Sequence, residues 1–313
     1  MPAFSAVAPG KIILFGEHAV VYSRPAIAVP VFGVQARVVV SANPRGSPGD
    51  VRIEAPAIGL DAALAEIPAE HPLAVAIQLA AQKLGVTRIP ACRLRITSTI
   101  PVAAGMGSGA AVSVALIRAL SAFLGGPLSD EHVSSLAFEV EKIYHGTPSG
   151  IDNTVITYGK PIFFLGGQPV ETLTLRKALY LVIGDTGIPS PTATAVGDVR
   201  RSWEAEKSRY ETLFDQIGNL TLQARQALES GQVEALGMLM NSNQELLGEL
   251  GVSCGELDRL IASARQAGAC GAKLSGGGRG GNMIALAPPE LAVGVASALQ
   301  TAGAVRILVT EVR

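Results

Sequence analysis

Apolar and polar residues alternate in several short stretches of this chain and recur with a helical period in longer ones. Alternation over Arg93–Ile100 predicts a strand with one buried face. Pro9-Gly10 is expected to separate the first two of the other strands. These are Phe4–Val7, Ile12–Phe15, Val34–Ser41, Ala178–Ile183, Met283–Ala287 and Val305–Val312. Asn43–Asp50 is rich in Pro, Gly and Ser and is expected to form a loop.

Helical spacing of apolar residues predicts three helices in the first half: His71–Leu84, Ala110–Phe123 and Asp130–Tyr144. Ser129 is expected to cap the third helix, because its hydroxyl can accept a hydrogen bond from a free amide of the first turn. Most of the second half has helical patterns, and they cover Thr192–Leu250, Gly255–Ala267 and Pro289–Thr301.

This order of elements predicts an α+β fold in two domains. The 313 residues are enough for two domains of ordinary size. The chain changes from a β-rich mixed half to a helix-rich α+β half near Leu175–Ala178, so we expect domains of residues 1–177 and 178–313.

Composition narrows the possible functions. The 25 basic and 26 acidic residues leave a net charge of -1, so the basic surplus that duplex binding needs is absent and nucleic acid is not expected as a main partner. Three distant cysteines lack metal-ligand spacing, which favours a reducing compartment without structural zinc. Ile96–Ile117 is uncharged but contains Pro101 and several glycines, so we expect a soluble, cytoplasmic protein with no membrane segment.

A first glycine loop, Gly105–Gly109, lies between a predicted strand and a predicted helix. Exposed amides at a helix N-terminus bind phosphate, and glycine lets a phosphate come close to the backbone. A plain tight turn explains the loop equally well. The loop is not a P-loop, because no Gly-Lys-Ser/Thr follows, and it is not placed as the dinucleotide fingerprint requires.

Lys11 is charged within an otherwise apolar run, and Glu17-His18 follow the same run. A lysine in such a run needs a partner or a ligand if it is buried. The alternatives are an edge strand with Lys11 in solvent, and a structural histidine at position 18.

Acidic side chains surround the constrained loop after the third helix, in His145–Thr154. Glu141 is at the border of the helix's apolar face, where a carboxylate should be paired, hydrogen-bonded or bound to a metal. Asp152 follows the loop. The alternatives are an ion pair for Glu141 with a nearby basic residue, and a turn capped by Asp152 with Asn153.

A second glycine loop is contained in Gly271–Asn282, with Arg279 at its centre. Apolar neighbours on both sides show that it is held inside a domain and is not a flexible linker. Arg279 could meet an anion or remain in solvent.

Taken together, these four motifs resemble, in order and spacing, those of the GHMP small-molecule kinases, from Ala8 to about Ala287. Within that superfamily they are most similar to the mevalonate kinases. The residues that follow Gly-Glu-His here, Ala19–Tyr22, differ from those typical of galactokinases. Diphosphomevalonate decarboxylases lack the motif lysine, which is present here as Lys11. Asp185–Thr192 and Met240–Leu247 are softer matches.

The resemblance implies ATP- and Mg²⁺-dependent phosphorylation of the 5-hydroxyl of (R)-mevalonate in isoprenoid biosynthesis, in a cleft between the two domains of a possible homodimer. Asp152 would orient or deprotonate the hydroxyl, and Lys11 would pair with Asp152 and stabilise the transferring phosphoryl group. Glu141 would hold Mg²⁺. The implied nucleotide-binding residues are Gly105, Met106, Gly107, Ser108, Gly109, Gly276, Gly277 and Gly278, and the implied substrate-binding residues are Glu17, His18 and Thr192.

Two positions depart from the family pattern. The first loop of the family usually ends in two serines, the second a magnesium ligand, whereas here it ends in Ser108 and Gly109, so Ser108 or a water molecule takes that role. Arg279 has no counterpart role. Alternative functions are a related kinase (mevalonate 3-kinase, phosphomevalonate kinase or sugar 1-kinase) and a non-catalytic sensor. A phosphorylated substrate would want a further cation, for which Arg24 is the candidate.

Overall fold

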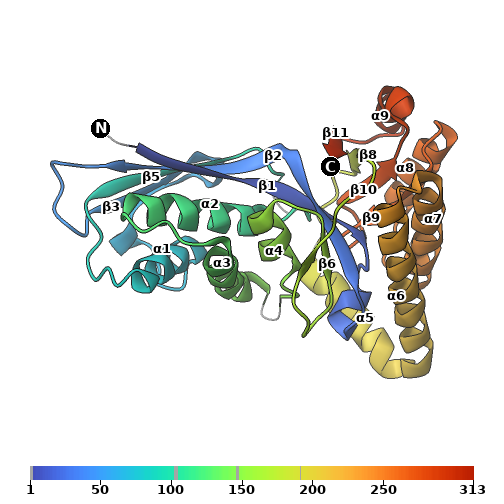
Figure 1. Cartoon of the computed structure of the whole chain (residues 1–313), viewed down its shortest axis with the longest axis horizontal. Helices are drawn as coiled ribbons and strands as arrows, with labels where there is room; N and C mark the ends of the chain where they lie inside the picture. The colour runs from blue at the N-terminus through green and yellow to red at the C-terminus, as the bar shows by residue number, and fades with distance from the viewer. Residues whose placement is uncertain (1–2, 102–104, 146–147, 191) are drawn as a thin grey trace. The chain divides into compact units, whose positions relative to one another are not determined.

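The computed structural model describes residues 3–101, 105–145, 148–190 and 192–313 (Figure 1). They form two compact units. The first unit contains the chain up to Gly10, Val34–Pro101 and Gly107–Gly159, and the second contains most of the remainder. This division is discontinuous because two long strands each contribute to both units, whereas the sequence pattern predicted one boundary after residue 177.

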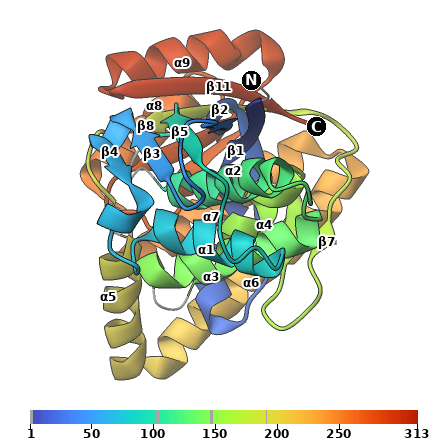
Figure 2. The ribbon, with the colours of Figure 1, turned by 90° about the vertical axis from the view of Figure 1, so that its left-hand side faces the viewer.

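The first unit is a mixed sheet with helices along one face (Figures 1 and 2). Its strands follow the order β4-β3-β5-β2, with β1 also paired to β2. β3 and β5 are parallel, and β2 and β5 are antiparallel. The strands are β1 (Ala3–Phe15), β2 (Ala26–Ala42), β3 (Val51–Ala55), β4 (Leu60–Ala63) and β5 (Cys92–Ser98). The helices are α1 (Pro72–Lys83), α2 (Ser108–Phe123), α3 (Asp130–His145) and α4 (Ile151–Tyr158), and two 3₁₀ turns are η2 (Pro56–Ile58) and η3 (Leu64–Glu66).

The long first strand corrects the sequence prediction. Phe4–Val7 and Ile12–Phe15 are parts of the single strand β1, and Pro9 does not interrupt it. Within the described residues β1 pairs with β2 alone, and a sheet edge tolerates a residue that lacks an amide hydrogen. The predicted strand at Val34–Ser41 is likewise the second half of the longer β2.

The helices of the first unit begin where local chemistry predicts. Pro72 occupies the first turn of α1, where its missing amide hydrogen costs nothing. The Ser129 hydroxyl accepts a hydrogen bond from the His132 amide at 3.4 Å, which confirms it as the cap of α3. Acidic residues in the first turn of α3 stabilise the helix, because they lie at the positive end of its dipole.

The second unit contains a four-stranded antiparallel sheet in the order β11-β8-β10-β9. Its strands are β8 (Leu179–Asp185), β9 (Gly271–Ser275), β10 (Asn282–Leu286) and β11 (Arg306–Val312). Its helices are α5 (Thr192–Ala205), α6 (Lys207–Ser230), α7 (Val233–Glu249), α8 (Gly255–Gln266) and α9 (Ala292–Thr301). Shorter elements are η1 (Ala19–Tyr22), β6 (Ile162–Phe164), β7 (Glu171–Thr172) and η4 (Pro289–Leu291).

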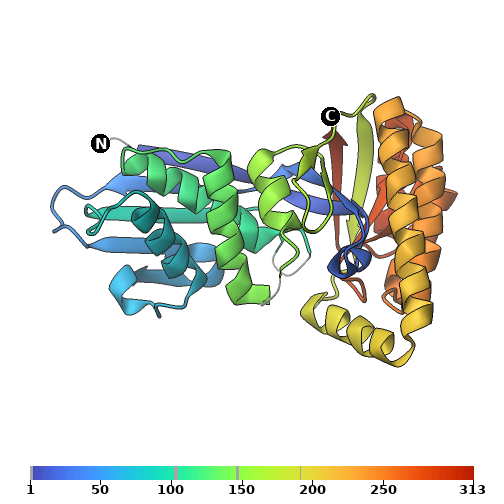
Figure 3. The ribbon, with the colours of Figure 1, turned by 60° about the horizontal axis from the view of Figure 1, so that its bottom comes forward.

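Helices cover this sheet closely. α7 and α8 pack against β9, and α9 packs against β8 and β11. α6 and α7 lie side by side (Figure 3). A Cβ atom at Gly271 of β9 would come within 2.6 Å of the Gly237 carbonyl carbon of α7, so these two glycines let helix and strand approach directly. The close approach brings the polar residues of α7 to the end of β9.

Within the described part of the chain, no helix is both long enough and apolar enough to cross a membrane.

Candidate functional site

The first glycine loop leads into the N-terminus of α2, as predicted. Gly105 and Gly107 have φ values of 74° and 71°, a left-handed conformation that favours glycine. α2 begins at Ser108, so Ser108 and Gly109 belong to its first turn, where amides lack partners within the helix. A Cβ atom at Gly105 would meet nothing within 4 Å. This open loop beside a helix N-terminus is suited to an anion. Residues 102–104 of the predicted motif lie outside the described residues.

Lys11 lies in β1 next to this loop. Its amide donates a hydrogen bond to the carbonyl of Met106 at 3.1 Å. Lys11 is 4% exposed, so the alternative of a lysine in solvent is wrong. A buried ammonium group needs compensation from charged or polar groups.

Ser108, Glu141 and Asp152 come from three helices of the first unit that contact one another, α2, α3 and α4. Glu141 is buried, and Asp152 is half-buried in the first turn of α4. Asn153 donates to the Ser134 hydroxyl at 2.9 Å and so holds α4 on α3. Residues 146–147, in the loop before α4, lie outside the described residues.

The donor set of these helices fits a magnesium ion that shares its ligands with phosphate. No group of three His, Cys, Asp or Glu side chains in the described segments could enclose a metal. Magnesium usually takes one or two carboxylates and completes its shell with phosphate and water. The buried carboxylate of Glu141 and the hydroxyl of Ser108 are hard oxygen donors of this kind.

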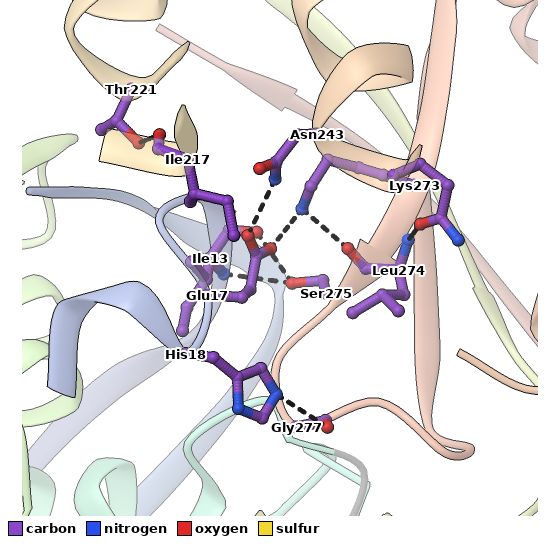
Figure 4. Close-up of polar contacts among 11 residues, drawn as sticks. Ile13, Glu17, His18, Ile217, Thr221, Asn243, Lys273, Leu274, Ser275 and Gly277 are labelled. Atoms are coloured by element: carbon purple, nitrogen blue, oxygen red, sulfur yellow. Dashed lines mark hydrogen bonds and ion pairs between the residues drawn. The ribbon is translucent and has the colours of Figure 1, made fainter. Parts of the chain in front are cut away.

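His18 follows β1 with a positive φ of 59° and a ψ of −47°. Its Nε2 lies 3.1 Å from the carbonyl oxygen of Gly277 (Figure 4). A carbonyl only accepts hydrogen bonds, so Nε2 carries the proton. Nδ1 is buried and has no hydrogen-bond partner among the described residues. The neutral ring therefore offers an acceptor at Nδ1.

The electrostatics of His18 keep this ring neutral. Burial lowers the pKa of His18 to about 4. The hydrogen bond to Gly277 opposes this shift, and the positive charge of Arg279 adds to it. At neutral pH His18 can thus accept a hydrogen bond from a ligand hydroxyl but does not supply a positive charge.

The second glycine loop joins two of the predicted substrate residues. A Cβ atom at Gly277 would lie 3.0 Å from both Cα and Oγ1 of Thr192, so Thr192 packs directly on the residue that binds His18. A Cβ atom at Gly276 would lie 4.0 Å from the Gly105 carbonyl oxygen, so Gly105 lies next to the second glycine loop. Residue 191, which precedes Thr192, lies outside the described residues.

Glu17 is completely buried and both of its carboxylate oxygens have protein partners (Figure 4). Oε1 forms an ion pair with Lys273 of β9, and Oε2 accepts a hydrogen bond from Asn243 of α7 at 3.2 Å. No role was predicted for Lys273 or Asn243 from the sequence. A signal was present for Lys273, because it is a lysine between apolar residues in a chain with few lysines.

The two arginines considered from the sequence have protein partners. Arg279, with φ of 58°, forms an ion pair with Asp198 of α5. Arg24 forms ion pairs with Glu211 and Asp215 of α6 and donates to the Tyr22 carbonyl at 2.6 Å.

Comparison with known proteins gives the same family as the motifs. Residues 71–160 match the family model for the N-terminal domain of GHMP kinases, and residues 224–305 match the model for their C-terminal domain. A mevalonate kinase of Pyrococcus horikoshii is 37% identical over 327 aligned positions, which cover 97% of this chain and 94% of the relative.

Solved structures agree over the whole chain. The L. major mevalonate kinase in complex with R-mevalonate has a TM-score of 0.83 and 33% identity, and the match covers 99% of this chain and 95% of that one. The Methanococcus jannaschii mevalonate kinase has a TM-score of 0.86 and 25% identity, with 100% and 99% of the two chains covered.

Proposed function

This chain belongs to the GHMP kinases, and we propose that it transfers the γ-phosphoryl group of ATP to the 5-hydroxyl of (R)-mevalonate. It is a kinase, as its relatives are. The observation that carries the choice of substrate is the meeting of His18 and Thr192 at Gly277, because all three come from motifs matched to mevalonate kinases.

In the proposed reaction a bond forms between the 5-oxygen and the γ-phosphorus, and the bond from that phosphorus to the β–γ bridging oxygen breaks. The 5-hydroxyl proton passes to Asp152 as the new bond forms. Lys11 stabilises the charge on the transferring group. Phosphoryl transfer depends mainly on positioning and electrostatic stabilisation, so the carboxylate of Asp152 and the ammonium group of Lys11 are suited to these two roles.

Mg²⁺ would be held by Glu141 and by Ser108. When bound, the ion neutralises charge on the β- and γ-phosphate oxygens. The amides of Gly105–Gly109 bind phosphate oxygens at the start of α2, and the loop of Gly276–Gly278 covers the nucleotide phosphates.

His18 would bind a hydroxyl group of mevalonate. Nδ1 accepts the hydrogen bond, since Nε2 is already committed to Gly277. Thr192 supplies a hydroxyl beside the same residue. The L. major relative was solved with R-mevalonate, which agrees with this choice of ligand.

Two alternatives are less well supported. Arg24 was the candidate cation for a phosphorylated substrate, but its guanidinium is held by Glu211 and Asp215, which disfavours phosphomevalonate. A sensor without activity would be expected to lack the base or the metal carboxylate, whereas Asp152, Lys11 and Glu141 are all present.

The test is coupled ADP release by the purified protein with ATP and Mg²⁺ on mevalonate, phosphomevalonate, galactose and homoserine. Phosphorus NMR of the product gives the position of the new phosphate. Selective turnover of mevalonate to the 5-phosphate is the expected result. Faster turnover of phosphomevalonate would reject the proposed substrate, and ATP binding without turnover of any compound would favour the sensor.

A further inference from the structure

A buried polar network joins the end of β1 to the end of β9 within the second unit. Lys273, Ser275 and Gly277 occupy alternate positions along β9 and the loop after it. Each contacts the segment Ile13–His18 (Figure 4). Alternate residues of a strand point to one side, so Lys273 and Ser275 lie on the same side of β9, and Gly277 follows in the loop after Gly276, whose φ is 91°.

The three contacts are chemically different. Lys273 forms the ion pair with Glu17. The Ser275 hydroxyl donates to the Ile13 carbonyl at 2.8 Å and accepts from the Ile13 amide at 3.2 Å. The third contact is the hydrogen bond of His18 to Gly277. The contacts of Lys273 and Ser275 hold the two backbone segments that carry His18 and Gly277.

Glu17 and Lys273 are fully buried, and a further hydrogen bond orients the side chain of each. The ammonium group of Lys273 also donates to the Leu274 carbonyl at 2.7 Å, and Asn243 donates to the second oxygen of Glu17. The backbone around Glu17 is constrained as well. Gly16 has φ of 93°, and a Cβ atom there would lie 2.6 Å from the Cα atom of Ala26.

Stability alone is a poor explanation for this pair. Removing two charges from water is costly, and apolar side chains of similar volume often stabilise a fold as well as a buried ion pair does. A buried pair with directed hydrogen bonds does restrict the relative position of the segments that carry it. Here those segments are the loop that presents His18 and the strand that leads into Gly276–Gly278.

We propose that Glu17 and Lys273, supported by Asn243, are positioning residues that hold His18 against Gly277 and do not contact the substrate. The kinetic effects expected from this assignment rest on the proposed function. The structural consequences of the assignment, the orientation of His18 and the order of the second glycine loop, can be measured without substrate.

The main test uses Glu17→Gln with Lys273→Met in one protein, because the double variant is neutral and leaves no unpaired charge in the interior. We expect a folded protein in which the pKa of His18, followed by NMR, rises by at least one unit from about 4. Amide exchange at Gly276–Gly278 should become at least tenfold faster. The KM for mevalonate should rise at least tenfold, with a smaller change in the KM for ATP.

The matched control is the double variant Glu171→Gln with Arg225→Met, which removes the ion pairs of Arg225 with Glu171 and Glu229 in the same unit. It should change none of the three measurements. If the double variant of Glu17 and Lys273 leaves all three unchanged, the pair serves folding only and the proposal is wrong.

A raised KM with an unchanged His18 pKa and unchanged loop exchange would also overturn the proposal, because Glu17 would then contact the substrate directly. If the double variant does not fold, Asn243→Ser removes one hydrogen bond to Glu17 and keeps the charges. It should raise the pKa of His18 and speed amide exchange at Gly276–Gly278, each by a smaller amount than in the double variant. Wild-type values of both would reject the proposal. If no substrate is turned over, the NMR and exchange measurements still decide the outcome.

Discussion

The Nε2 atom of His18 lies 3.1 Å from the carbonyl oxygen of Gly277, although 259 positions separate the two residues in the chain. This contact determines which nitrogen of the ring carries the proton and leaves the other as an acceptor. It also links the histidine to the second glycine loop.

The stability of the protein should depend on the protonation of His18. Its pKa is lowered to about 4 in the folded state from 6.5, so between these values the unfolded chain binds more protons and stability falls as the pH is lowered. The contribution present above pH 6.5 is about 3 kcal/mol and is lost as the pH falls towards 4.

Urea unfolding between pH 7.5 and 4.5 measures this effect. His18→Asn, which keeps a polar side chain but does not titrate, should lose most of the slope between pH 6.5 and 4.5. His132→Asn is the control, because His132 lies at the exposed start of α3. Equal slopes in wild type and His18→Asn would show that other groups cause the acid sensitivity.

Asp152→Asn should lower kcat by at least a hundredfold while ATP binding changes little. The reason is that the proposed carboxylate acts on the 5-hydroxyl of mevalonate and not on the nucleotide. Steady-state kinetics and calorimetric titration with ATP separate the two quantities. Asp61→Asn, an exposed change in the same unit, is the control. An equal loss of nucleotide affinity would contradict the proposed role.

Ser108→Ala should raise the Mg²⁺ concentration needed for half-maximal kcat/KM by about tenfold, a magnitude typical of changes around a metal site. The dependence of kcat/KM on free Mg²⁺ at saturating ATP checks this. Ser135→Ala, at an exposed position of α3, should behave as wild type. No difference between the two variants would mean that Ser108 is not a ligand.

Gly277→Ala should impair substrate binding without unfolding the protein. The new methyl group would lie 3.0 Å from Thr192, so the loop or the start of α5 must shift by a few tenths of an ångström. We expect the KM for mevalonate to rise by about tenfold, which corresponds to about 1.4 kcal/mol.

The control for this change is Gly248→Ala in α7. A Cβ atom there meets nothing within 4 Å, and alanine should stabilise the helix by about 0.5–1 kcal/mol. If Gly277→Ala has an unchanged KM, Thr192 does not need the close contact with the loop.

Local patterns in the sequence predicted most of the regular structure and the sets of residues that belong to each motif. The strand β5 and the helices α1 and α3 lie where the periodicity placed them, because half-buried strands and helices repeat every two and every 3.6 residues. The glycine loop before α2 was also predicted from the sequence, since a tight turn between a strand and a helix needs the positive φ values that glycine adopts.

Only the tertiary structure decided what Glu17, Lys273 and Arg279 contact. Glu17 and Lys273 are 256 positions apart, and neither the spacing nor the composition around either residue carries information about the other. The single strand β1 is a similar case, because a proline is tolerated there by the pairing of the strand and not by its own sequence. The sequence thus determined the elements and the motif residues, through interactions over a few positions. The folded chain determined which motifs meet, because that depends on packing between distant segments.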